Sequence, residues 1–308
     1  MHRSVYLTGA TASGKTAVGV ALAQHLDAEV IALDSMTLYR GMDIGTAKPT
    51  LDEREGVPHH LIDVLDPWQS ASVADYRGWA LQTAAEIEGR GKRILFVGGT
   101  ALYLKALLRG LFEGPAADTA LRQELEAEAD RRGPEALHAR LETLDPRSAA
   151  RLHPNDRRRL VRALEVLALT GRRLSDLQTE HEQPAPDDVA VFALQRPRPE
   201  MHDRINRRVV AMFREGFVEE VRRLRESDPP ISPVAAQGVG YLEVLEHLET
   251  GIPLERTISL IQARTRQFAK RQETWFRGLS EVKPWPVATS EPPGVTARAL
   301  ADRISSGN

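Results

Sequence analysis

The feature that most constrains this chain lies near its N-terminus, where an apolar run passes through a glycine-rich turn into a helical pattern. The run covers residues 4–8, and the turn is GATASGKT over residues 9–16, which matches G-x-x-x-x-G-K-[ST]. Glycines let the backbone wrap around an anion, the following helix N-terminus directs N–H groups at it, and Lys15 adds a point charge. The Thr16 hydroxyl suits Mg²⁺. The pattern predicts a phosphate- or diphosphate-binding loop between a strand and a helix, rather than a chance turn.

The composition is that of an ordinary globular protein: 308 residues, 42% hydrophobic and 27% charged, enough for one or two domains. We expect a cytoplasmic protein with no membrane partner, because we find no apolar run of spanning length and no signal-peptide pattern. The absence of cysteine excludes disulfides and thiolate zinc sites. Six of the 41 basic residues are lysine and the rest arginine, which fits phosphate binding and biased base composition equally well.

Strands and helices alternate over the first part of the chain. The strand pattern of residues 29–33 ends at Asp34, and that of residues 93–97 leads through Gly-Gly-Thr into another helix. Ser72 is expected to cap an intervening helix that Gly89 ends. Alternation predicts a parallel sheet flanked by helices, with ligands at the carboxyl ends of the strands. Asp34 is therefore expected near the phosphate-binding loop, although a role as a cap or turn former is equally compatible.

The connection over residues 36–71 is rich in Gly, Pro and polar residues and has no periodicity. A long irregular connection in a compact domain is usually functional. His59 and His60 are adjacent and cannot face one way on a helix, so metal binding by this pair is the weaker hypothesis.

Residues 114–187 change character and carry only helical patterns, at about 118–132, 134–143, 146–153 and 156–170. A strand pattern returns at residues 189–194. We therefore predict an α/β fold with a P-loop NTPase-like parallel sheet, in which residues 1–113 and 188–308 form the core and residues 114–187 form an all-helical insertion domain. The insertion has a basic cluster that suits either a solvated helix face or an RNA contact; it consists of Arg157, Arg158, Arg159 and Arg162.

Further helices are predicted at 200–214, 216–226 and 241–250, and a long one over residues 254–277. On the long helix an apolar stripe is expected to pack into the core; it consists of Leu254, Ile258, Ile261, Phe268 and Trp275. Arg266, Lys270 and Arg277 share another face, which suits a nucleic-acid backbone or a solvated surface.

The residues alone allow three kinds of protein. One is a nucleotide or small-molecule kinase whose helical insertion is a lid. Another is a transferase directed at nucleic acid, in which the loop holds a diphosphate leaving group. A nucleotide switch is less well supported. Asp34 could bind Mg²⁺, accept a proton from a kinase substrate or accept one from an attacking amine, and spacing does not choose among these roles.

The chain resembles the bacterial-type tRNA dimethylallyltransferases, also called tRNA isopentenyltransferases. Matching blocks follow the family's order along nearly the whole chain. They are GATASGKT (9–16), LDSMTLYRGMDIGTAKP (33–49), PHHLID (58–63), SVADYR (72–77), LFVGGTALYLKALL (95–108), HPNDRRRLVRALEV (153–166), GFVEEVRRL (216–224), GVGYLEV (238–244) and TRQFAKRQETWFRG (265–278). Ala10 stands where the family usually has proline, Thr37 occupies a variable position, and the zinc-finger extension of eukaryotic members is missing.

This resemblance implies transfer of a dimethylallyl group from dimethylallyl diphosphate to N6 of adenosine 37 in the tRNA anticodon stem-loop, with Mg²⁺ as cofactor, by a monomer. Asp34 would accept the proton of the amine, Thr100 would lie at the reacting end of a channel, and Arg222 would stabilise the leaving group. The diphosphate would be bound by Gly9, Ala10, Thr11, Ala12, Ser13, Gly14, Lys15 and Thr16, with Mg²⁺ on Thr16. Contacts with tRNA are expected from Asp34, Ser35, Met36, Thr37, Thr100, Arg122, Arg157, Arg158, Arg159, Leu160, Val161, Gln237, Gly238, Tyr241, Arg266 and Lys270.

Overall fold

Six parallel strands form the centre of the larger of two units in the computed structural model, which describes residues 4–112, 114–177 and 189–306. One unit comprises residues 1–108 and 185–308, and the other residues 109–184. The segment boundaries predicted at residues 113 and 187 fall on positions outside the described ranges. The strands, in the spatial order β3-β2-β4-β1-β5-β6, are β1 (Val5–Gly9), β2 (Ala28–Ala32), β3 (His59–His60), β4 (Arg93–Val97), β5 (Ala190–Gln195) and β6 (Val282–Pro286).

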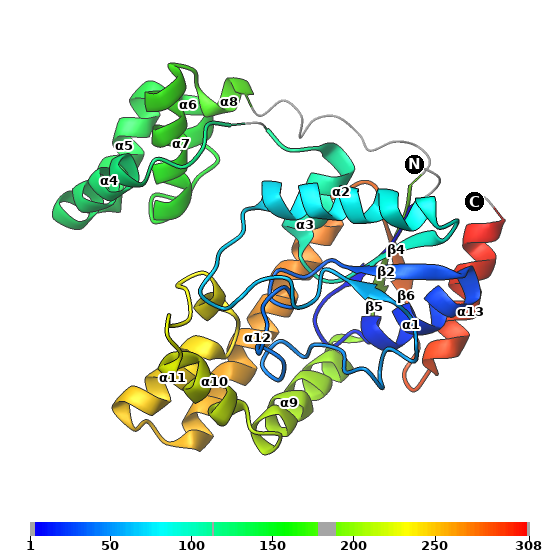
Figure 1. The fold of residues 1–308 in the computed structure, drawn as a ribbon. Coiled ribbons are helices and arrows are strands. Elements are labelled where there is room, and N and C mark those ends of the chain that lie inside the picture. Colours follow the sequence, from blue (N-terminus) through cyan, green and yellow to red (C-terminus); the bar gives the residue numbers. More distant parts are fainter. Residues whose placement is uncertain (1–3, 113, 178–188, 307–308) are drawn as a thin grey trace. The chain divides into compact units, whose positions relative to one another are not determined.

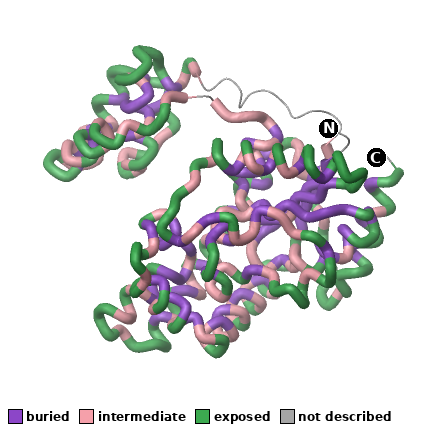
Figure 2. Tube along the Cα trace, viewed as in Figure 1, coloured by how far each residue is buried: buried purple, intermediate pink, exposed green. Residues whose placement is uncertain are grey.

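Helices cover both faces of this sheet, as the alternating pattern predicts (Figure 1). One face packs on α1 (Lys15–Leu26) and α13 (Pro293–Ser305). The other packs on α2 (Val73–Gly89), α3 (Ala101–Arg109), α9 (Arg198–Arg214), α10 (Phe217–Glu226), α11 (Tyr241–Thr250) and α12 (Leu254–Arg277), with a short 3-10 helix, η2 (Ala235–Gln237). The central strands are buried on both sides, which Figure 2 shows. Successive residues such as Tyr6 and Leu7 therefore belong to opposite cores.

The smaller unit is all-helical and has its own apolar core. Leu137, Leu141, Leu160 and Val166 are fully buried there. Its helices are α4 (Thr119–Arg132), α5 (Pro134–Leu144), α6 (Pro146–Ala149), α7 (Arg157–Thr170) and α8 (Leu174–Leu177). Among the described residues of the chain, no helix is both long and apolar enough to cross a membrane.

Local sequence signals account for several element ends. Ser72 caps α2 by accepting a hydrogen bond from the backbone N–H of Asp75, whose carboxylate accepts one in return from Ser72, and the helix ends at Gly89 as expected. The two-residue strand β3 was not predicted. It lies within the connection expected to be irregular and pairs with Val30 and Ile31.

The predicted apolar stripe of α12 is confirmed at Ile261, which is buried, and at Ile258, which is partly buried and packs against the same core, but it is wrong at Leu254 and Trp275. Leu254 and Trp275 are 36% and 39% exposed. The buried face instead consists of Thr257, Ile261, Thr265, Ala269, Gln272 and Phe276. Mostly small or hydrogen-bonded side chains face inward, and large apolar ones remain partly in solvent. A prediction from helical periodicity assumes that the most hydrophobic face is buried. It therefore fails for a helix whose buried face consists of small and hydrogen-bonded side chains.

Candidate active site

The phosphate-binding loop (residues 9–16) connects the end of β1 to the start of α1, and its glycines are required by its geometry. Gly9 has φ +143° and Gly14 has φ +97°, which side chains rarely adopt. A Cβ on Gly9 would lie 2.8 Å from the carbonyl oxygen of Leu194 on β5. The first N–H groups of α1 have no partner within the helix, so they are suited to an anion.

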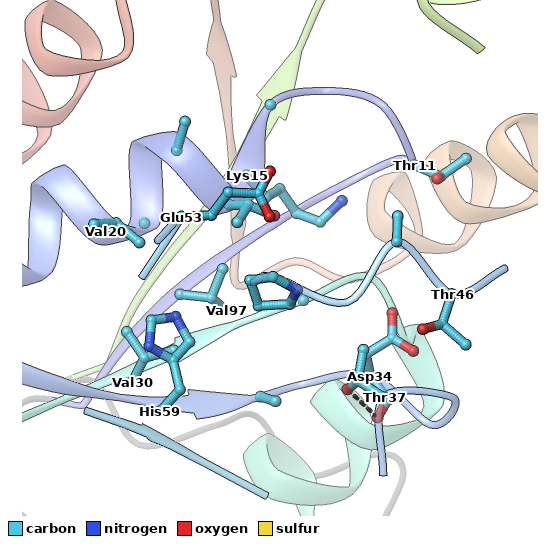
Figure 3. Close-up of a pocket in the computed structure, with 18 of the residues that line it drawn as sticks. Thr11, Lys15, Val20, Val30, Asp34, Thr37, Thr46, Glu53, His59 and Val97 are labelled. Carbon is cyan, nitrogen blue, oxygen red and sulfur yellow. Dashed lines mark hydrogen bonds between the residues drawn. The ribbon is translucent and has the colours of Figure 1, made fainter. Parts of the chain in front are cut away.

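A cavity of about 560 Å³ lies beside this loop (Figure 3). Besides residues of β2, β3 and the end of β4, four segments contribute to its lining. The loop and first turn of α1 contribute Thr11, Ala12, Gly14, Lys15 and Thr16, the segment after β2 contributes Asp34 and Thr37, the long connection contributes Thr46, Ala47 and Pro49, and α9 contributes Arg204, Arg207 and Arg208. The carboxyl ends of parallel strands share one sheet edge, and this explains why Asp34 reaches the loop as predicted.

Lys15 and Asp34 are neighbouring groups of opposite charge in this cavity. Burial lowers the pKa of Lys15 to about 8, against the attraction of Asp34, and the Lys15 Nζ donates a hydrogen bond of 2.8 Å to the carbonyl of Ala10. Burial raises the pKa of Asp34, while a backbone N–H from Met36, 2.9 Å away, and the charge of Lys15 oppose that shift. A ligand group of opposite charge beside either side chain would therefore stabilise the charged form of that side chain.

Arginines of α9 and the adjacent segment support the phosphate-binding loop, and the sequence analysis missed them. Arg208 donates to the Thr11 hydroxyl, and its buried Nε has no protein partner. Burial lowers the pKa of Arg208 to about 10. Arg204 donates to the carbonyl of Ala12 at 2.8 Å. An orphaned, buried guanidinium N–H beside an anion loop indicates a site for negative charge.

Arg222, which was expected at the leaving group, is not among the residues that line this cavity. It lies on α10 and forms an ion pair with Glu219, three residues before it. Arg204 and Arg208 of α9 line the cavity and contact the phosphate-binding loop. The spacing of four residues between Arg204 and Arg208 on a predicted helix was the available signal, because it places both on one face.

Thr100 lies next to the segment that carries Asp34. Its N–H donates to the carbonyl of Leu33 at 3.1 Å, and its hydroxyl accepts from the N–H of Ser35 at 3.1 Å. The preceding glycines permit this approach, since a Cβ on Gly98 would lie 2.0 Å from the Leu33 carbonyl oxygen. The Gly-Gly-Thr corner is thus held against the end of β2 through its backbone and the Thr100 hydroxyl.

The residues expected to contact tRNA in the core unit differ in accessibility. Ser35 and Met36 are partly exposed, while Gln237 and Lys270 are exposed. Tyr241 is fully buried and donates to Glu220 at 2.7 Å, so its side chain does not reach solvent. The remaining three are Thr37, buried at the cavity wall, Gly238, buried after η2, and Arg266, which donates to Asn206 at 2.6 Å.

In the helical unit, the expected tRNA residues are of two kinds. Leu160 and Val161 are core residues, 0% and 3% exposed, so their side chains serve packing. The arginines are mostly engaged with acids: Arg122 with the buried Glu165, Arg157 with Asp130, and Arg159 with Asp156, while Arg158 is exposed. Three of these four arginines are therefore paired with acids, and Arg158 is the exposed arginine of the set.

Comparison with known proteins gives a consistent result. The sequence matches the IPP transferase family over residues 37–279 and the isopentenyl transferase family over residues 3–64. It is 47% identical to a tRNA dimethylallyltransferase of Geobacter metallireducens, over 91% of each chain. Among solved structures, the fold is similar to a tRNA isopentenylpyrophosphate transferase of Bacillus halodurans, with 39% identity, a TM-score of 0.72 and 100% and 98% of the two chains covered. A eukaryotic dimethylallyltransferase acting on tRNA has 28% identity and a TM-score of 0.84, over 99% of this chain and 79% of that one.

Proposed function

The chain belongs to the IPP transferase family, and on this basis we propose that it transfers a dimethylallyl group from dimethylallyl diphosphate to N6 of adenosine 37 in tRNA, releasing diphosphate. The observation that carries the proposal is that the phosphate-binding loop and the Asp34 carboxylate line one cavity. Its relatives are named tRNA dimethylallyltransferases. We also propose that the protein is a monomer in the cytoplasm. Its lack of cysteine is compatible with a reducing compartment.

The diphosphate of the donor would bind at the first turn of α1, where backbone N–H groups converge with Lys15. Arg208 would add a second positive charge through the N–H that has no protein partner. As the C–O bond of the donor breaks, its electron pair goes to the diphosphate oxygen. These fixed donors stabilise the charge that develops there without rearrangement.

The residues present also suit Mg²⁺. Thr16 lines the cavity, and within the described part of the chain no cluster of three acidic, His or Cys side chains offers a complete protein cage. Mg²⁺ is commonly held by one or two side chains together with substrate phosphates and water. Thr16 would hold the ion against the diphosphate, and Mg²⁺ when bound would neutralise part of the leaving-group charge.

Asp34 would act as the base. The lone pair of N6 forms the new N–C bond to the donor's first carbon, and the nitrogen must lose a proton as this happens. A carboxylate within hydrogen-bond reach accepts that proton and orients the amine. The raised pKa of Asp34 makes it a stronger base than a solvated aspartate.

The test is an incubation of the protein with tRNA that lacks the modification, Mg²⁺, and either dimethylallyl diphosphate or ATP. The tRNA is then digested and its nucleosides are separated and weighed by mass spectrometry. Prenylated adenosine from the first mixture supports the proposal. Its absence, with phosphate transfer from ATP in the second mixture, would favour a kinase.

A further inference from the structure

Gln272 joins two separate walls of the active site through its carboxamide. Its Oε1 accepts a hydrogen bond of 2.8 Å from the N–H of Thr11 in the phosphate-binding loop, and its Nε2 donates one of 2.8 Å to the carbonyl of Gly99. The side chain lies on the buried face of α12 and is only 6% exposed. One end of an amide accepts and the other donates, so both bonds are satisfied in one orientation only.

The surroundings of Gln272 are shaped to accept this amide. A Cβ on Gly99 would lie 2.5 Å from Gln272 Nε2, so glycine at this position makes room for the bond. Small buried neighbours on the same helix, Thr265 and Ala269, let α12 come close to the site. A side chain of equal volume without polar atoms would fill the space but leave a buried N–H and a buried carbonyl without partners.

Each end of this bridge contacts a residue next to the reacting groups. On one side, Thr11 belongs to the diphosphate-binding loop and also accepts a hydrogen bond from Arg208. On the other side, Gly99 precedes Thr100, whose hydroxyl accepts from the N–H of Ser35, the residue after Asp34. Three hydrogen bonds, made by the side chains of Gln272 and Thr100, therefore connect the leaving-group site to the segment that carries the base.

We propose that Gln272 is a positioning residue that sets the distance between the phosphate-binding loop and the Gly-Gly-Thr corner, and thereby aligns the donor with Asp34. This inference rests on the proposed function. It predicts a larger effect on kcat than on donor affinity, because the first-turn N–H groups of α1 and Lys15 remain available to diphosphate when the bridge is lost.

The decisive variant is Gln272→Met, which keeps the volume and removes both hydrogen bonds. Gln262→Met is the matched control, since Gln262 lies on the same helix and donates 3.2 Å to the carbonyl of Asn206. We expect Gln272→Met to lower kcat by about 10-fold to 100-fold, the cost of misplacing reacting groups by about 1 Å, with little change in KM for dimethylallyl diphosphate or in Kd for inorganic diphosphate. The control should keep a kcat close to that of the unmodified enzyme.

Other outcomes decide against the proposal. A kcat for Gln272→Met equal to that of the Gln262→Met control, or a loss seen equally in diphosphate Kd, would overturn it. If Gln272→Met does not fold, Gln272→Glu replaces it: this variant keeps the acceptor for Thr11 but places an oxygen against the carbonyl of Gly99, and should show the same split. Should the unmodified protein form no prenylated adenosine, the proposed function fails by itself. The Gln272 proposal is then judged by crystal structures, in which only the Gln272 variant should change the separation of Thr11 and Gly99.

Discussion

At the residue scale, the most consequential pair is Lys15 and Asp34, because burial disfavours the charged form of each. Burial lowers the pKa of Lys15 to about 8 and raises the pKa of Asp34. Asp34 stabilises the charge of Lys15, whereas the charge of Asp34 is stabilised first by the N–H of Met36 and then by Lys15. Donor binding adds negative charge beside Lys15 and Arg208, which favours their protonated forms.

These shifts predict a bell-shaped pH dependence of kcat/KM for the donor. Activity should rise as Asp34 loses its proton, at a pH above that of an ordinary aspartate, and fall above about pH 8 as Lys15 loses its own. In kcat, measured with saturating donor, the alkaline limb should move to higher pH because bound diphosphate holds Lys15 protonated. An alkaline limb that survives unchanged in Lys15→Met would assign it to another group.

Replacement of the base gives a second prediction at this scale. Asp34→Asn keeps the shape of the side chain but cannot accept the proton, so kcat should fall by about 10² to 10⁴. Binding of dimethylallyl diphosphate, measured by calorimetry, should remain close to that of the unmodified protein. Near-normal turnover in this variant would remove Asp34 from the proposed role.

Sequence analysis predicts part of this site well. The phosphate-binding loop is found because its glycines, lysine and threonine are contiguous, and Asp34 because a strand end locates it. Arg208 and Gln272 are different, since their roles depend on where α9 and α12 pack. Neither spacing nor hydrophobicity encodes a hydrogen bond between residues 11 and 272, which are distant in the chain.

At the scale of elements, the carboxylate of Glu220 on α10 organises part of the long connection. It accepts hydrogen bonds of 2.7 to 3.1 Å from the backbone N–H groups of residues 43–45, and one of 2.7 Å from the hydroxyl of Tyr241. Residues Thr46, Ala47 and Pro49, which follow, line the cavity. A segment without regular structure is thus held in one conformation by a helix far along the chain.

We therefore expect Glu220→Gln to destabilise the protein by about 1 to 3 kcal/mol, because an amide presents a donor to N–H groups that then lack an acceptor. Tyr241→Phe, which removes a single bond, should cost about 0.5 to 1.5 kcal/mol. Urea unfolding measures both, and a Glu220→Gln protein as stable as the parent would contradict the anchoring role. Loosening of the cavity wall should also raise KM for the donor.

The periodicity of apolar residues predicts the presence of a helix or strand more reliably than it predicts which face of that element is buried. The helices at 119–132, 134–144 and 157–170 lie close to where helical patterns place them. The inward face of α12 was misassigned because polar side chains with partners are buried there. The strand at His59 and His60 has no sequence signal, because two residues are too few to show alternation. Its pairing depends on β2 and on the hydrogen bond of 2.6 Å between His60 and Glu29.

At the scale of the whole molecule, the net charge is only -2, so contacts with the proposed tRNA partner have to come from particular basic residues rather than from the overall charge. If Lys270 in the core unit and Arg158 in the helical unit each contact a phosphate, substitution by Gln should weaken tRNA binding and reduce the salt slope by about 1 in each case. Arg298, exposed on α13 against the opposite face of the sheet, supplies the control. Filter binding over a series of salt concentrations measures the slopes; equal slopes for all three variants and the parent would mean that these are solvated charges.

The strand order has a consequence for the growing polypeptide. β1 lies between β4 and β5, so it has a neighbour on one side only until residues 190–195 have been synthesised. A chain that stops before β5 contains the complete phosphate-binding motif, but its first strand is a sheet edge, open to pairing with other chains. Arg208 and Gln272 arrive later still. The phosphate-binding motif is therefore among the first parts of the protein to be synthesised. The strand β5 and the side chains of Arg208 and Gln272, which support it, are translated only after the whole helical unit.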